Sequence, residues 1–184
     1  MTNPILLAEE ADEEEFLAAY DPAVTPTYQS ETVGSTVLFG ALSNLDPDAR
    51  VAIANRLLDD GADPSVVTRN GTTVLHVLLA NPEPGPEGDA HVLRRLLAGG
   101  APINLIDSKR GAPLAILFDN YSLEDDEAEP YYEAFFERPD LNLDAPGNMG
   151  LRTVRESIGM ASENRPIPYR MMLDYDKRKF DVNE

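Results

Sequence analysis

Four glycines recur along the chain at nearly constant intervals, and this repeat constrains the fold more than any other feature. Gly34, Gly71, Gly111 and Gly150 lie 37, 40 and 39 residues apart. Two further signals, Gly61-Ala62 and Gly100-Ala101, follow apolar runs and lie 39 residues apart. Self-similarity at such a period is typical of repeat proteins, in which each repeat is one supersecondary unit. We therefore expect a chain built from several similar units.

Each unit has the pattern of two helices. Thr36 and Thr73 precede apolar runs, and a threonine hydroxyl at that place can cap the first helical turn. The second helix of the first unit is expected to begin at Asp46-Pro47, a capping residue followed by a proline, and to end at Gly61. One such pair cannot cover its own apolar stripe, so neighbours must stack. The pattern predicts an all-α solenoid of three to four helix–turn–helix units.

The repeat also sets the expected domain organisation. We predict an acidic N-terminal capping segment over residues 1–31, a repeat domain over 32–176 and a polar, frayed tail over 177–184. The approximate units are 32–68, 69–107, 108–146 and 147–176. Within the first segment, Asp12 to Tyr20 favours one short helix that covers the exposed core of the first unit. The last unit keeps only the glycine and the outline, and is expected to be a degenerate C-terminal repeat.

Two kinds of motif resemble ankyrin repeats. Gly71-Thr72-Thr73-Val74-Leu75-His76 is similar to the ankyrin Gly-x-Thr-Pro-Leu-His signature. Leu57-Leu58-x-x-Gly-Ala-Asp and Leu96-Leu97-x-x-Gly-Ala-Pro-Ile-Asn resemble the end of an ankyrin unit's second helix. The resemblance implies an ankyrin-repeat solenoid, although the period exceeds the usual length of about 33 residues. The extra residues fall between the helices of a unit, over Ser43–Asp46, Asn81–Asp89 and Asn120–Glu129.

The net charge of −18 is concentrated in two zones. Residues 1–31 contain eight acidic and no basic residues, and residues 119–140 contain nine acidic residues against Arg138. Such zones repel phosphate backbones and anionic membranes, and attract basic surfaces. We therefore expect no direct binding to nucleic acid or to membranes. The alternative interpretation is that the acidity only keeps the protein in solution.

The sequence offers little for catalysis. It has no cysteine, which excludes disulfides and thiolate metal sites. Dinucleotide, Walker, nucleophile-elbow and zinc-protease motifs are absent, and Leu123–Glu129 lacks the spacing of a calcium loop. His76 matches the ankyrin histidine, whose role in that family is a structural bond to the backbone. We expect no catalytic residue, cofactor or metal. The remaining alternative is that the protein is an enzyme, which would act through His76 and nearby carboxylates.

The ankyrin resemblance implies binding of a partner protein through the loop tips between repeats and the outer positions of each first helix. The acidic edge between the helices of a unit is a second candidate surface. The predicted partner-binding residues are Ser35, Arg69, Asn70, Thr72, Asn81, Lys109, Arg110, Asp119, Tyr121, Glu124, Asp125, Asp126, Tyr131, Asn148, Met149 and Glu156.

Small bacterial ankyrin proteins, which the chain also resembles, include immunity proteins paired with toxins. Together with the charge, this favours a stoichiometric inhibitor or immunity protein that neutralises a basic partner such as a toxin or nuclease. The alternative is a general cytoplasmic adaptor or regulatory scaffold. We expect a monomer, because a capped solenoid is usually monomeric. We expect it in the cytoplasm, because the apolar start Met1 to Leu7 lacks the basic residues of a signal peptide. No apolar run approaches the roughly 20 residues of a membrane helix.

Overall fold

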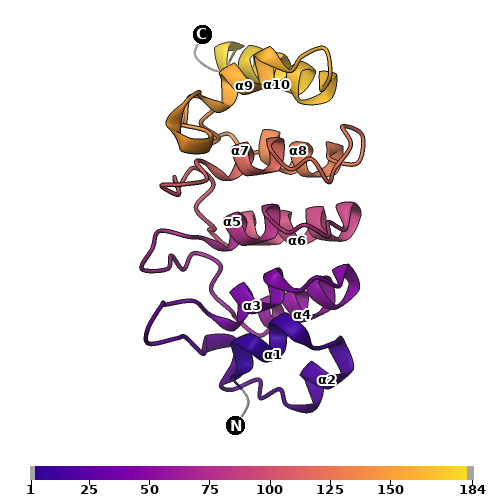
Figure 1. The fold of residues 1–184 in the computed structure, drawn as a ribbon, viewed down its shortest axis with the longest axis vertical. Helices are drawn as coiled ribbons and strands as arrows, with labels where there is room; N and C mark the ends of the chain where they lie inside the picture. Colours follow the sequence, from indigo (N-terminus) through magenta and orange to yellow (C-terminus); the bar gives the residue numbers. More distant parts are fainter. Residues whose placement is uncertain (1–2, 182–184) are drawn as a thin grey trace. The chain divides into compact units, whose positions relative to one another are not determined.

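The computed structural model describes residues 3–181 (Figure 1). Within them the chain forms ten α-helices and two short 3₁₀ helices, and its β-structure is confined to isolated bridges. The predicted all-α class is therefore confirmed. In residues 3–181, none of the helices combines the length and the apolar character needed to cross a membrane. The chain divides into two compact units, Met1–Pro102 and Ile103–Glu184, which we call the N-terminal and C-terminal units.

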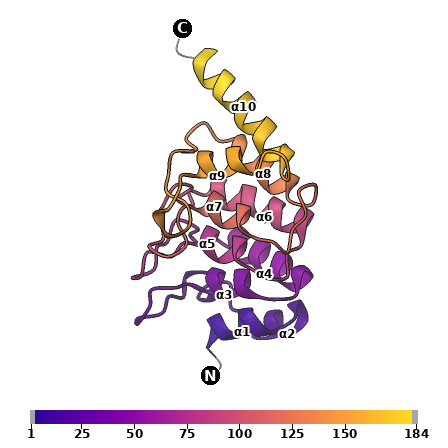
Figure 2. The same ribbon diagram turned by 45° about the horizontal axis from the view of Figure 1, so that its top comes forward.

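The N-terminal unit consists of three helix pairs. They are α1 (Pro4–Glu10) with α2 (Glu13–Ala18), α3 (Val37–Ser43) with α4 (Pro47–Asp59), and α5 (Val74–Leu79) with α6 (Pro86–Ala98); the 3₁₀ helix η1 (Thr25–Thr27) lies between the first two pairs. α3 packs against both α1 and α5, and α4 packs against both α2 and α6. The first helices thus form one layer and the second helices another (Figure 2).

Two of the predicted side-chain caps are confirmed. Asp46 accepts hydrogen bonds from the amides of Asp48 and Ala49, and Thr73 accepts one from the amide of His76. α3 also begins as predicted, with Thr36 at the N-cap, but the cap expected from the Thr36 hydroxyl is wrong, because its side chain makes no capping bond. The antiparallel bridge between Gln29 and Thr36 fixes the start of α3 through the backbone instead.

The predicted single N-terminal capping helix is wrong in number, because two helices cover the first repeat. The helix expected over Asp12–Tyr20 is α2, with Asp12 as its cap and Phe16 buried. α1 precedes it and packs so closely on α3 that a Cβ on Gly40 would lie 2.1 Å from the carbonyl oxygen of Ile5. This contact covers the apolar face of α3.

A turn with one left-handed glycine precedes each of α3, α5, α7 and α9. Gly34, Gly71, Gly111 and Gly150 have φ angles of 81°, 81°, 80° and 67°. An antiparallel bridge closes or adjoins each turn, for example Val67 with Thr73 and Pro146 with Thr153. Positive φ is readily adopted only by glycine, so the glycine period found in the sequence marks the turns that start successive helix pairs.

The C-terminal unit contains two helix pairs. They are α7 (Pro113–Phe118) with α8 (Glu129–Phe136), and α9 (Val154–Met160) with α10 (Pro166–Asp181); the 3₁₀ helix η2 (Asn148–Gly150) precedes α9. α7 packs against α9, and α8 packs against α10. The predicted frayed tail is wrong for residues 177–181, which continue α10, while residues 182–184 lie outside the described part of the chain. The Tyr175 hydroxyl of α10 has the carbonyl oxygens of Arg138, Pro139 and Leu141 within hydrogen-bond distance, and Leu141 is the nearest at 2.9 Å.

Candidate functional site

The connection between α7 and α8, residues 119–128, carries five acidic residues, and we call it the acidic loop. Its carboxylates are Asp119, Glu124, Asp125, Asp126 and Glu127, of which only Asp125 is half-buried. Among them stands Tyr121, whose exposed fraction of 87% is the highest of any large hydrophobic residue in the described chain. The loop therefore combines negative charge with one solvent-facing aromatic ring.

The turn between α9 and α10 holds the acidic loop through hydrogen bonds. Arg165 donates to the carbonyl oxygen of Leu123 at 3.0 Å and to that of Asn120 at 3.4 Å. Its other terminal nitrogen donates to the Tyr132 hydroxyl at 2.9 Å. Burial raises the pKa of Tyr132 more than the nearby Arg165 lowers it, so the hydroxyl stays neutral. These bonds fix the backbone of the loop on both sides of Tyr121.

Two further contacts order the same loop. The backbone amide of Ile167 donates to Asp125 Oδ2 at 3.0 Å. Leu123 and Ala128 are buried, with exposed fractions of 4% and 0%. Because Leu123 and Ala128 are packed and the carbonyl groups of Asn120 and Leu123 are bonded, the loop presents its outer carboxylates from a defined backbone.

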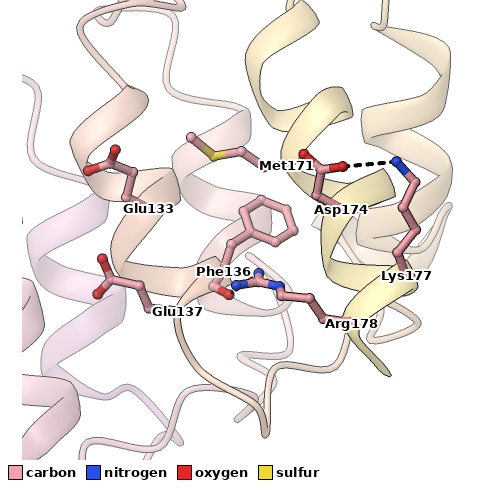
Figure 3. A pocket seen from close by; sticks show the side chains of 7 residues that line it. All are labelled: Glu133, Phe136, Glu137, Met171, Asp174, Lys177 and Arg178. Carbon is pink, nitrogen blue, oxygen red and sulfur yellow. Dashed lines mark hydrogen bonds and ion pairs between the residues drawn. The ribbon is translucent and has the colours of Figure 1, made fainter. Parts of the chain in front are cut away.

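A groove lies between α8 and α10 (Figure 3). It has a volume of about 510 Å³ and is lined by Glu133, Phe136, Glu137, Met171, Asp174, Lys177 and Arg178. Phe136 and Met171 face the space between the helices, and Glu133 and Glu137 lie along α8 (Figure 3). Lys177 pairs with Asp174 at 3.1 Å, and Arg178 donates to the carbonyl oxygen of Phe136 at 2.9 Å. The groove thus has an apolar floor and charged walls.

The turns before α7 and α9 form a different surface of the C-terminal unit. The amide of Met149 donates to the carbonyl oxygen of Lys109 at 3.4 Å, which places the two turns side by side. Lys109 and Arg110 are exposed, and the exposed fraction of Met149 is 74%. Glu156 is exposed and accepts hydrogen bonds from the amide and hydroxyl of Thr153 in a capping box. The side chain of Asn148 lies outside the described residues.

The predicted residues of the N-terminal unit lie at two neighbouring turns. Arg69 and Asn70 are exposed, whereas Ser35 and Thr72 are half-buried. Arg69 joins the turns, because its amide donates to the carbonyl oxygen of Val33 and its guanidinium donates to that of Thr32, both at 3.0 Å. Arg69 was predicted to bind a partner, and in the structure it makes hydrogen bonds within the N-terminal unit.

Two predicted binding residues, Asn81 and Tyr131, are wrong because both are buried. Asn81 is 4% exposed and donates to the carbonyl oxygens of Leu42 and Asn44, which end α3. A polar residue was needed there to satisfy those carbonyl groups inside the unit. Tyr131 is 2% exposed because it lies on the inward face of α8 beside Tyr132 and Phe135, which are also buried.

His76, the candidate for catalysis, is fully buried. The backbone amide of Thr73 donates to its Nδ1 at 3.1 Å, and the Thr73 hydroxyl lies 2.7 Å from the same atom. The imidazole therefore caps the first turn of α5, the structural role that the ankyrin resemblance implies. Among the described residues, no group of three or more His, Asp or Glu side chains is arranged to hold a metal ion.

The sequence did not predict the roles of Arg165, which holds the acidic loop, or of Phe136 and Met171, which line the groove. Arg165 lies 42 residues from Leu123, the carbonyl group that it binds. The only available signal was its opposite charge, which does not identify a partner. Phe136 and Met171 are recognisable as apolar helix positions, but that pattern gives no groove between two helices.

Comparisons with known proteins support the architecture. No protein-family model matches the chain, and no curated protein matches it. The crystal structure of a functionally unknown protein from Leptotrichia buccalis C-1013-b is similar, with a TM-score of 0.75 and 24% sequence identity. The match covers 96% of this chain and 94% of that one. At this identity the likeness shows a shared fold, and the class that the fold defines is an all-helical protein of paired helices.

Proposed function

We propose that the chain is a protein-binding ankyrin-repeat solenoid that acts as a stoichiometric inhibitor, or immunity protein, of a basic partner such as a toxin or nuclease. Several features support the ankyrin assignment. Helix pairs follow turns that each contain a left-handed glycine, and His76 caps α5 as the family signature implies. Stacked pairs of this kind bind partners through extended surfaces rather than enclosed pockets.

The observation that carries the functional proposal is the ordered acidic loop with Tyr121 at its surface. Negative charge steers a basic partner toward the loop and raises the association rate. Tyrosine is enriched among the residues that dominate binding energy, because it combines a large ring with a polar hydroxyl. Since Arg165 and the buried Leu123 already hold the backbone, little conformational entropy is lost on binding.

The groove between α8 and α10 offers two further carboxylates, Glu133 and Glu137, while Lys177 is paired with Asp174 and Arg178 with the carbonyl oxygen of Phe136. Lysine and arginine side chains pair a long aliphatic stem with a charged end. The stem of a partner's lysine or arginine would lie on Phe136 and Met171, and its charge would face Glu133 and Glu137. A basic partner can therefore use both the loop and the groove.

The test uses the product of the adjacent gene as the probe. We expect it to co-purify with the chain and to slow growth when expressed without it. Tyr121→Ala should weaken the complex about thirtyfold or more, as for loss of an interface anchor worth about 2 kcal/mol. Glu124→Lys/Asp126→Lys should chiefly slow association and reduce its dependence on salt.

The matched control is Glu9→Lys/Glu10→Lys, which changes the net charge equally on exposed positions of α1. It should leave affinity within about twofold of the wild type. Absence of both a complex and growth protection would reject the immunity proposal. A complex whose association rate does not change with salt would favour the adaptor alternative.

A further inference from the structure

Three of the most exposed apolar side chains of the described residues belong to one segment, residues 149–160. Leu151, Met149 and Met160 have exposed fractions of 80%, 74% and 68%. Leu151 and Met160 line a hollow of about 470 Å³ together with Arg152, Glu156 and Gly159, and we call it the α9 hollow. Large apolar side chains gathered at one place on a surface mark interaction sites.

The α9 hollow is kept open by a glycine inside a helix. Gly159 belongs to α9, and a Cβ built on it would meet nothing within 4 Å. No close packing contact therefore requires glycine there, although glycine in a helix costs about 0.5–1 kcal/mol relative to alanine. A larger residue would project into the hollow. A need for open space beside Gly159 would explain why α9 keeps a glycine that lowers its stability.

Met149, beside the hollow in the chain, has an unusual backbone. Its φ of 55° is the only positive φ of a non-glycine residue among the described residues. Such a conformation costs on the order of 1 kcal/mol or more, and residues of this kind cluster at functional sites. Met149 retains it while its side chain is 74% exposed, so burial of that side chain within the unit does not explain it.

The charges around the hollow differ from those of the chain as a whole. Arg152 lines the hollow, and Lys109 and Arg110 lie on the turn bonded to Met149; all three are exposed. The acidic lining residue, Glu156, has its carboxylate engaged with Thr153. This edge is therefore locally cationic in a chain of net charge −18.

We propose that the α9 hollow is a second docking site, which takes an aliphatic or aromatic side chain flanked by a carboxylate, on a segment of a partner protein. The apolar group enters the hollow between Leu151 and Met160, and the carboxylate pairs with Arg152 or Lys109. The site goes beyond the proposed function, because its lining residues lie outside the acidic loop and it prefers the opposite charge.

The test is selection of a random peptide library displayed on phage against the full chain. We expect enrichment of peptides with Asp or Glu next to Leu, Phe or Trp. Gly159→Trp fills the hollow and should weaken a synthetic copy of the enriched peptide at least tenfold, as should Arg152→Glu. The control Ala98→Trp, at an exposed position of α6, should change affinity less than twofold. Circular dichroism confirms that each variant is folded.

A second readout locates the peptide directly. In a chain labelled with ¹³C at the methionine methyl groups, the peptide should shift Met149 and Met160 and leave Met172, which is buried, unchanged. Tyr121→Ala should not affect this binding, so failure of this site and failure of the acidic loop are distinguishable. The proposal is overturned if no peptide is enriched, if enriched peptides are basic, or if Gly159→Trp binds them normally. It is also overturned if the chain alone dimerises through the hollow and Gly159→Trp makes it monomeric.

Discussion

Replacing Arg50 with methionine should strongly destabilise the N-terminal unit. Arg50 is fully buried in α4, and Asp89 of α6 is 1% exposed. The pair is bidentate, with Nε and Nη2 each 2.8 Å from a different carboxylate oxygen of Asp89. Arg50 also donates to the carbonyl oxygens of Asn44 and Glu83. One guanidinium therefore joins two helix pairs.

The expected magnitude follows from what remains after the substitution. Arg50→Met leaves a buried carboxylate without its cation, which costs about 3–5 kcal/mol. For a chain of this length, each kcal/mol lowers Tm by about 2–4 °C, so the transition should fall by about 6–20 °C. The double variant Arg50→Met/Asp89→Leu removes both charges and should recover part of the loss. Recovery is incomplete because the Glu83 carbonyl oxygen loses the donor on Arg50 and the Gly85 amide loses its acceptor on Asp89.

The assay is a double-mutant cycle measured by urea unfolding. We expect a coupling energy of about 2 kcal/mol or more between Arg50 and Asp89. Hydrogen exchange gives a local readout, because the amide of Gly85 donates to Asp89 Oδ2 at 2.9 Å and should exchange faster in Asp89→Leu. A loss below about 1 kcal/mol in Arg50→Met, or additive single effects, would refute the assigned role of the ion pair.

Three further predictions concern other contacts. Gly40→Ala should destabilise by about 1–3 kcal/mol, because its Cβ would meet the Ile5 carbonyl oxygen; a gain in urea resistance would contradict the packing of α1. Burial and the bond to Asp60 raise the pKa of Tyr20 to about 12, so ultraviolet titration should show a late-titrating tyrosine that is lost in Tyr20→Phe. Because the folded state stabilises the neutral hydroxyl, the contribution of Tyr20 to folding stability is complete below pH 10 and disappears as the pH rises through 12. An unchanged titration curve in Tyr20→Phe would show that Tyr20 is not the late-titrating tyrosine. Arg165→Met should speed hydrogen exchange across residues 120–125 and cost about 1.5–3 kcal/mol, whereas unchanged exchange would show that the acidic loop is ordered without Arg165.

The sequence predicts the features that local chemistry determines. The glycine period locates the turns because a left-handed backbone needs glycine within a few residues of each helix start. Asp46-Pro47 locates α4 because the cap and the proline act on adjacent residues. α6 begins at Pro86, inside the loop expected over Asn81–Asp89, although the same rule for an N1 proline could have placed it.

Other features depend on contacts that local patterns do not contain. Tyr121 and Tyr131 both lie in the acidic stretch, yet one is 87% exposed and the other 2%. Tyr131 belongs to the buried face of α8, whereas Tyr121 lies in the loop that precedes this helix. Arg50 and Asp89 lie 39 residues apart, so their pairing requires the stacking of one helix pair on the next. The α9 hollow likewise depends on the space around Gly159, which a sequence does not specify.

The N-terminal unit buries hydrogen-bonded polar groups, whereas the C-terminal unit exposes large apolar side chains. This difference supports a division of roles between stability and binding. In the N-terminal unit, a buried ion pair and the buried amide of Asn81 satisfy backbone carbonyl groups within the unit. In the C-terminal unit lie the four most exposed large apolar side chains of the described residues: Tyr121, Leu151, Met149 and Met160. A group bonded inside the protein is unavailable to a partner, whereas an exposed apolar group gains by being covered. Substitutions at Arg50 should therefore change stability, while those at Tyr121 and Gly159 should change binding at nearly constant stability.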